Sequence, residues 1–275
     1  MPHATINGND LFYDEHGSGA PLLIHHGYTG SHYNWDDVVP LLSDRYRVIR
    51  MDGRGAGDSS RPESGHSIEQ YAADVIGMAD HLGLERFTYI GHSMGGVIGY
   101  ELGLEYGGRL EKLVLVAPAP ADGVQMPAGV RERSQGLRRN ADLATMYHEA
   151  WMLSAQPRDR ALVEERVRRA NGVSDAHYEE SWEALVTYRK GDRLGEIMTP
   201  TLLIAGAADG LLAANLKDFP RLGNATLHVF SRVSHGIPYE VPESFAAVVA
   251  DFLQHGVVTA ATLQRGLRES AVAAG

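Results

Sequence analysis

The fold of this 275-residue chain is decided by the stretch Tyr89-Ile90-Gly91-His92-Ser93-Met94-Gly95-Gly96. The apolar run Phe87–Ile90 predicts a buried strand, and the pattern of residues 97–106 predicts a helix. Between them lies G-x-S-x-G, which is typical of a sharp strand-to-helix turn that exposes a nucleophilic serine. Side chains at the flanking glycines would collide with the neighbouring backbone in such a turn. We therefore expect Ser93 to adopt a strained conformation beside the free N–H groups of a helix N-terminus.

Strand and helix patterns alternate along most of the chain, which predicts a mainly parallel sheet with helices on both faces. The expected strands are residues 4–6 and 10–15, joined by a turn at Asn7-Gly8, and then Pro21–His25, Tyr46–Met51, Leu113–Val116, Thr201–Ala205 and Thr226–Phe230. The expected helices include Tyr33–Leu42, one that Ser67 caps and that runs to about Leu82, and Pro242–His255. From Gly256 onward the pattern is weak, with another helix as one possibility.

Residues 122–193 interrupt this alternation with helical patterns and no convincing strand. Apolar and aromatic residues recur at helical spacing around Tyr147 and Trp151, and a second stripe passes through Tyr178 and Trp182. A helical insertion here would cover the carboxyl edge of the sheet, where α/β folds place their sites. We therefore predict that Trp151 and Tyr147 contact the substrate, with Trp151 as the roof of a pocket; packing inside the insertion is the alternative.

Composition narrows the classes of partner. The formal net charge of −10 disfavours general binding to nucleic acids or anionic membranes. The chain has no cysteine, which excludes a disulfide and a thiol nucleophile. It has no apolar stretch of the roughly 20 residues that span a bilayer and no secretory signal pattern, so the cytoplasm is the expected location. The expected partner is a small-molecule substrate.

A nucleophilic serine needs a base, and thirteen histidines are available. His235 follows the last expected strand, and so lies at the carboxyl edge of the sheet where Ser93 emerges. The base in turn needs a carboxylate that fixes its tautomer. Asp209 follows the strand Thr201–Ala205 at the same edge, whereas Asp122, after the strand Leu113–Val116, is the alternative acid.

The chain order Ser93, Asp209, His235 is that of α/β-hydrolases, and the sequence resembles a lidded member of that family over nearly its full length. His26-Gly27-Tyr28 resembles the oxyanion loop of the family, which implies that the backbone N–H groups of Tyr28 and Met94 form the oxyanion hole. Residues 52–59 resemble the D-x-R-G-x-G-x-S turn of the family, so that the glycines there are interpreted as structural and not as a dinucleotide site.

The resemblance implies a mostly parallel, eight-stranded sheet with helices on both faces and a helical lid inserted after the sixth strand. The core domain would comprise residues 1–121 and 194–275, and the lid residues 122–193. The implied activity is hydrolysis of a small or medium carboxylic ester or lactone by a serine esterase mechanism, with no metal or organic cofactor.

Other activities of the family are either kept as alternatives or disfavoured by residues at the nucleophile elbow. Haloalkane dehalogenases and epoxide hydrolases of this family carry Asp where Ser93 stands, and many proline iminopeptidases carry a G-G-S-W-G-S elbow that is absent here. Carbon–carbon bond hydrolases share the triad, although their oxyanion loop usually reads closer to H-G-x-G-P-G. A ligand receptor derived from such a hydrolase is the second alternative. Fold-level resemblance does not identify the substrate.

Overall fold

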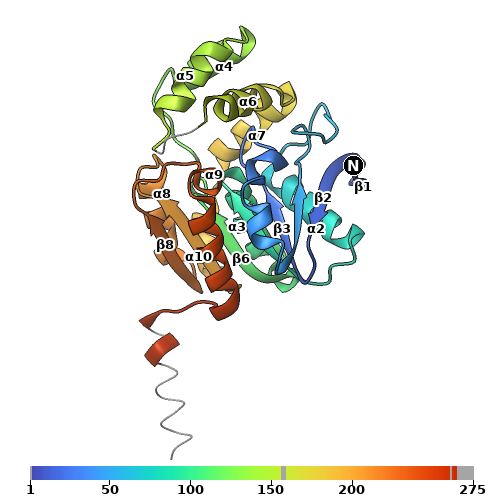
Figure 1. Ribbon diagram of the computed structural model, residues 1–275, viewed down its shortest axis with the longest axis vertical. Helices are drawn as coiled ribbons and strands as arrows, with labels where there is room; N and C mark the ends of the chain where they lie inside the picture. The colour runs from blue at the N-terminus through green and yellow to red at the C-terminus, as the bar shows by residue number, and fades with distance from the viewer. Residues whose placement is uncertain (1, 156–158, 261, 265–275) are drawn as a thin grey trace, which may run out of the picture.

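A single eight-stranded sheet forms the centre of the molecule in the computed structural model, which describes residues 2–155, 159–260 and 262–264 (Figure 1). Its strand order is β1-β2-β4-β3-β5-β6-β7-β8, and the six strands from β4 to β8 run parallel. The strands are β1 (His3–Ile6), β2 (Asn9–His16), β3 (Ala20–His25), β4 (Tyr46–Met51), β5 (Phe87–His92), β6 (Leu110–Val116), β7 (Thr201–Gly206) and β8 (Ala225–Phe230). The expected fold class, a mostly parallel eight-stranded sheet with helices, is confirmed.

Helices cover both faces of the sheet because side chains of successive strand residues point to opposite faces. On one face α2 and α3 pack against one row of strand side chains, and on the other α1 and α10 pack against the alternate row. The α-helices are α1 (Val39–Leu42), α2 (Ile68–His81), α3 (Met94–Glu105), α4 (Val130–Arg139), α5 (Leu143–Met152), α6 (Arg160–Asn171), α7 (Asp175–Thr187), α8 (Leu212–Asp218), α9 (Ile237–Glu240) and α10 (Pro242–His255). The 3₁₀ helices are η1 (His32–Trp35), η2 (Gly107–Arg109), η3 (Gly191–Glu196) and η4 (Phe219–Arg221). None of the described helices combines the length and the apolar composition that a membrane-spanning segment requires.

One expected helix is divided in two. The sequence predicts a helix over Tyr33–Leu42, whereas the structure has η1, a short turn and then α1. Pro40 lies in the first turn of α1, where its missing N–H costs nothing, but within a continuous helix it would leave a backbone carbonyl without its donor. The other expected strands and helices are present, with ends that differ by a few residues. The predicted turn at Asn7-Gly8 is confirmed, with φ of 48° and 76°. Of the weakly patterned end of the chain, residues 261 and 265–275 lie outside the described part.

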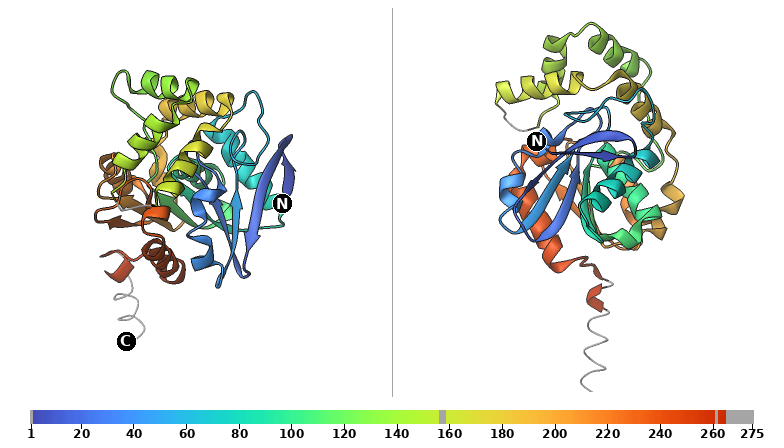
Figure 2. Two further views of the ribbon diagram at one scale, coloured as in Figure 1. Left: turned by 45° about the horizontal axis from the view of Figure 1, so that its top comes forward. Right: turned by 90° about the vertical axis from the view of Figure 1, so that its right-hand side faces the viewer.

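Helices α4 to α7 gather at one end of the molecule, above the carboxyl ends of the parallel strands (Figures 1 and 2). They lie between β6 and β7 in the chain, inside the expected insertion 122–193. Helix α7 is hydrogen-bonded to the core through the buried Tyr71 hydroxyl of α2. This hydroxyl lies 2.7 Å from His177 Nδ1 and 2.8 Å from Ser181 Oγ. Beyond α7, the Lys190 ammonium donates to the buried carboxylate of Glu101 on α3 at 2.6–2.7 Å.

The turn after β4 is organised around the fully buried carboxylate of Asp52. This carboxylate accepts hydrogen bonds from the His32 N–H at 2.6 Å, His32 Nδ1 at 2.8 Å and the Asp58 N–H at 2.8 Å. Gly57, at φ 50°, leaves the room that the carboxylate needs, since a Cβ there would lie 2.0 Å from Asp52 Oδ2. The glycine-rich stretch thus serves the packing of β4 and η1 around a buried charge.

Replacement of this carboxylate should reveal its contribution to stability. Burial raises the pKa of Asp52, but the His32 hydrogen bond and neighbouring charges outweigh burial, and the pKa falls below the ordinary 3.8. The ionised form therefore adds stability that is complete above pH ~4 and is lost as the pH falls through the folded-state pKa. Asp52→Asn should cost about 2 kcal/mol at pH 7, or roughly 5 °C in Tm.

The measurement is thermal unfolding of the wild type and of the variant between pH 3 and 7, with the exposed Asp58→Asn of the same turn as the control. The difference between wild type and Asp52→Asn should shrink below about pH 4, whereas the control should change Tm little at any pH. A difference that is constant across this range would contradict the role assigned to the charge.

Candidate active site

Ser93 occupies a strained turn between β5 and α3. Its backbone lies at φ 55° and ψ −110°, a conformation that side-chain-bearing residues rarely adopt and that costs of order 1–3 kcal/mol. The turn is sharp because its glycines are in close contact with other backbone. A Cβ on Gly91 would lie 2.1 Å from the Gly95 carbonyl oxygen, and one on Gly95 would lie 2.7 Å from that of His26. The glycines therefore position Ser93 at the start of α3.

His235 and Asp209 come together from two loops at the carboxyl edge of the sheet. Asp209 lies in the turn after β7, and its Oδ2 is 2.8 Å from His235 Nδ1. Its Oδ1 accepts the Leu211 N–H at 3.0 Å. Burial raises the pKa of Asp209, but the hydrogen bonds from His235 and Leu211 help to outweigh burial, and the pKa lies below its usual value. An ionised carboxylate can only accept, so His235 donates from Nδ1 and keeps Nε2 available as a base.

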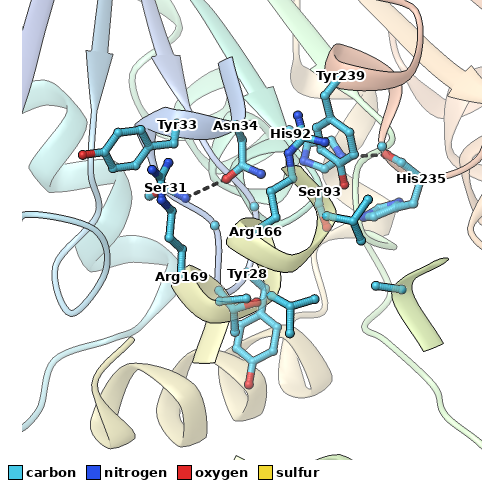
Figure 3. A pocket seen from close by; sticks show the side chains of 18 of the residues that line it. Tyr28, Ser31, Tyr33, Asn34, His92, Ser93, Arg166, Arg169, His235 and Tyr239 are labelled. Atoms are coloured by element: carbon cyan, nitrogen blue, oxygen red, sulfur yellow. Dashed lines mark hydrogen bonds between the residues drawn. The ribbon is translucent and has the colours of Figure 1, made fainter. Parts of the chain in front are cut away.

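Two further side chains hold the loop that carries His235. His92 Nε2 donates to the His235 carbonyl oxygen at 2.8 Å (Figure 3), because burial and the nearby His235 lower the pKa of His92 to about 3 and leave its ring neutral. Glu240 accepts from the Ser234 N–H at 2.9 Å and from the Ser234 hydroxyl. No sequence pattern identifies Glu240, because its position in the short helix α9, behind the histidine loop, gives no local signal.

Ser93 and His235 line one cavity of about 320 Å³ between the core and helices α5 and α6 (Figure 3). Gly27 and Tyr28 line it as well. The loop of Gly27 passes directly over the nucleophile, since a Cβ on this glycine would lie only 2.9 Å from Ser93 Cβ. Met94 is the first residue of α3, where the N–H group has no partner within the helix. The geometry thus brings both expected oxyanion-hole residues next to Ser93.

The side chain of Tyr28 ties this loop to α4 and α7. Its hydroxyl donates to the Tyr178 carbonyl oxygen at 2.5 Å and accepts from Arg131 Nη1 at 3.0 Å. Arg131 Nη2 donates to the same Tyr178 oxygen at 2.9 Å. The tyrosine that carries the candidate oxyanion N–H is therefore shared between the core and the helices above it.

Tyr147 and Trp151 lie beside the cavity without lining it. Both are on α5, with ring centroids 6.1 Å apart, and Trp151 is 39% exposed. The same segment lines the cavity with Ala150, Leu153 and Ser154. Successive helical residues are about 100° apart around the axis, so the position next to Ala150 turns Trp151 aside. This differs from the expectation that these two aromatic residues contact the substrate.

The alternative acid, Asp122, is engaged elsewhere. Its carboxylate forms ion pairs with Lys217 at 2.7 Å and with Arg221 at 2.8 Å, and the hydrogen bond from Arg221 lowers its pKa. Across residues 2–155, 159–260 and 262–264, no group of three His, Asp or Glu side chains could hold a metal ion.

Comparisons with known proteins agree with this architecture. Residues 20–242 match the alpha/beta hydrolase fold family. A non-heme haloperoxidase of Rhodococcus erythropolis is 32% identical over 257 residues, which cover 86% of this chain and 93% of that protein. A 2-hydroxy-6-oxononadienedioate/2-hydroxy-6-oxononatrienedioate hydrolase of Paraburkholderia xenovorans (strain LB400) is 31% identical over 263 residues, which cover 89% and 91% of the two chains. The enol-lactonase from Burkholderia xenovorans LB400 superposes with a TM-score of 0.82 at 25% identity, over 92% of this chain and all of that one (100%). The chain therefore belongs to the α/β-hydrolase fold family.

Proposed function

We propose that this hydrolase cleaves small or medium carboxylic esters or lactones through an acyl-enzyme intermediate on Ser93. The observation that carries the proposal is the 2.8 Å hydrogen bond from His235 to the buried Asp209, on a cavity that Ser93 also lines. A base oriented by a carboxylate, in one cavity with a serine on a strained elbow, is the arrangement that activates a hydroxyl for attack on a carbonyl carbon.

The reaction follows from the roles of the three side chains. The Ser93 hydroxyl attacks the carbonyl carbon while His235 Nε2 takes its proton, and Asp209 stabilises the resulting imidazolium. His235 then protonates the departing alkoxide, which leaves an ester between Ser93 and the acyl group. Water attacks this ester with His235 again as the base, which releases the acid and restores Ser93.

The oxyanion of each tetrahedral intermediate would be held by the backbone N–H groups of Tyr28 and Met94. Each such donor is commonly worth about 3 kcal/mol of the barrier, because it is oriented before the negative charge develops. The α3 dipole adds a positive potential at the same point. Helices α4 to α7 would act as a lid that closes the cavity above these groups.

The volume of the cavity argues for a compact substrate. About 320 Å³ is near the lower end of the range for small-molecule sites. The structural similarity to an enol-lactonase supports a lactone as one substrate form. Carbon–carbon bond hydrolysis is the second candidate, because a relative that is 31% identical is named as a hydrolase of 2-hydroxy-6-oxo dienedioates and the same triad could serve that reaction.

Ser93→Ala should reduce the turnover of aryl esters by a factor on the order of 10³ or more, because only substrate binding and the oxyanion hole would still contribute to catalysis. A fluorophosphonate should add one equivalent to the wild type, at Ser93, and none to the variant. We would measure kcat/KM of the wild type and of Ser93→Ala on aryl esters, lactones and β-diketones, and record unfolding curves to show that the variant is folded. Labelling at another residue, or higher kcat/KM on β-diketones than on esters and lactones, would contradict the proposal.

Asp209→Asn should reduce kcat by roughly 10³-fold or more, since an amide cannot hold the working tautomer of His235 or stabilise its charged form. Asp122→Asn is the matched control, because the same change there breaks only the ion pairs with Lys217 and Arg221. Ester turnover by both variants is the measurement. An inactive Asp122→Asn beside an active Asp209→Asn would assign the acid to the earlier strand.

Ala150→Phe should narrow the cavity and lower kcat/KM for phenyl hexanoate more than for phenyl acetate, by roughly 10-fold in the ratio. Trp151→Ala, one residue further along α5, should leave this ratio within about 2-fold, since Trp151 does not line the cavity. Kinetics on both esters and the Tm of each variant provide the test. A larger change of selectivity in Trp151→Ala would restore the tryptophan as the roof of the pocket.

A further inference from the structure

The wall of the cavity formed by α6 carries two arginines. Arg166 and Arg169 both line the cavity, and their side chains extend from α6 toward the core (Figure 3). The third residue of formal charge in the lining is Glu240. In a chain of net charge −10, the lining of this cavity therefore has a formal charge of +1, from two arginines and one glutamate.

Aromatic rings hold both guanidinium groups in place. The Arg166 guanidinium carbon lies 4.0 Å from the centroid of the Tyr239 ring, and that of Arg169 lies 3.4 Å from the Tyr33 centroid. A guanidinium that packs on an aromatic ring uses its flat face, and its N–H groups are directed sideways in its own plane. That geometry matches the two oxygens of a carboxylate and is set before a ligand arrives.

Glu240 and the two arginines each contact a neighbouring side chain. Glu240 is held by the N–H and hydroxyl of Ser234, and Arg169 donates to Glu165 at 2.8 Å. Arg166 forms an ion pair with Asp37 at 3.4 Å, a long contact to a side chain that is 45% exposed. Such exposed pairs contribute little to stability, so replacement of the Asp37 contact itself by a ligand carboxylate would cost little free energy.

Tyr239 places Arg166 on the His235 side of the cavity. The ring packs against Gly236, where a Cβ would lie 2.2 Å from Tyr239 Cε2, and Gly236 directly follows His235. In the proposed reaction His235 delivers its proton to the leaving group, so a substrate group near Tyr239 belongs to the alcohol part of the ester.

We propose that Arg166 binds a carboxylate on the alcohol part of the substrate, which makes anionic esters or lactones the preferred substrate class. This inference rests on the proposed ester hydrolysis and adds a specificity-determining residue to it. The guanidinium would form a charge-assisted, two-point contact with the carboxylate, whereas a neutral ester of the same shape would leave the charge without this partner.

The test compares cleavage of the acetyl ester in 4-acetoxybenzoate and in methyl 4-acetoxybenzoate, where a methyl group removes the negative charge of the carboxylate. The wild type should have the higher kcat/KM on the anion. Arg166→Met should reduce the ratio of the two kcat/KM values roughly 10- to 30-fold, mainly through KM, and Arg166→Lys should restore part of it. An unchanged ratio in Arg166→Met would overturn the proposal.

Two control variants separate the local contact from other effects. Arg168→Met removes the same charge from the same helix at a side chain that is 53% exposed, and Asp37→Asn breaks the ion pair but keeps the guanidinium. Both should keep the preference for the anion, and Asp37→Asn should strengthen it. An equal loss of preference in Arg168→Met would show a general charge effect and would count against a site at Arg166.

Binding of benzoate to the Ser93→Ala variant, measured by calorimetry, tests the anion site without turnover. Affinity should fall roughly 10-fold or more when Arg166→Met is added. If neither ester is cleaved but benzoate binding depends on Arg166, the proposed function fails and the anion site stands. If the esters are cleaved and benzoate binding ignores Arg166, the anion site fails and the proposed function stands.

Discussion

Close packing of backbone around Ser93 is the constraint on which the rest of the site depends. The β3 strand lies beside β5 with His25 opposite Gly91, so the loop after β3 meets the serine turn at the same level of the sheet. The two backbones can approach only where Cβ atoms are missing, at Gly27, Gly91 and Gly95. The strain at Ser93 is thus maintained by the neighbouring strands, whose register is set by many hydrogen bonds and by buried apolar side chains.

The carboxyl edge of the sheet also positions Asp209 and His235, which follow β7 and β8. The Asp209 carboxylate is buried, and the His235 ring lines the cavity. His92 and Glu240 hold the loop of His235 through hydrogen bonds with His235 and Ser234. Each group has a partner that fixes its direction, which keeps the base ready without a rearrangement when the substrate arrives. In such cavities a small number of fixed polar groups sets the orientation of the ligand and provides specificity.

Local sequence patterns were sufficient to predict the strands, helix caps and turns, because these depend on neighbouring residues in the chain. The alternation of apolar runs, the cap at Ser67 and the turn at Asn7-Gly8 predicted elements that the structure contains. Asp209 and His235 could be selected because each follows a parallel strand, and all such strands end at one edge. Arg166, Tyr239 and the orientation of Trp151 could not be predicted, since they depend on how helices far apart in sequence pack together. Periodicity identified the face of α5 but not which residue of that face meets the cavity.

Tyr28 couples the loop over Ser93 to helices α4 and α7. Its backbone belongs to the loop over Ser93, while its hydroxyl is bound to Tyr178 and Arg131. Any displacement of α4 and α7 from the core must either break these bonds or pull the loop with it. If the bonds hold, the displacement carries the loop away from Ser93; if they break, the loop keeps its place and the Tyr28 hydroxyl loses its contacts with Tyr178 and Arg131.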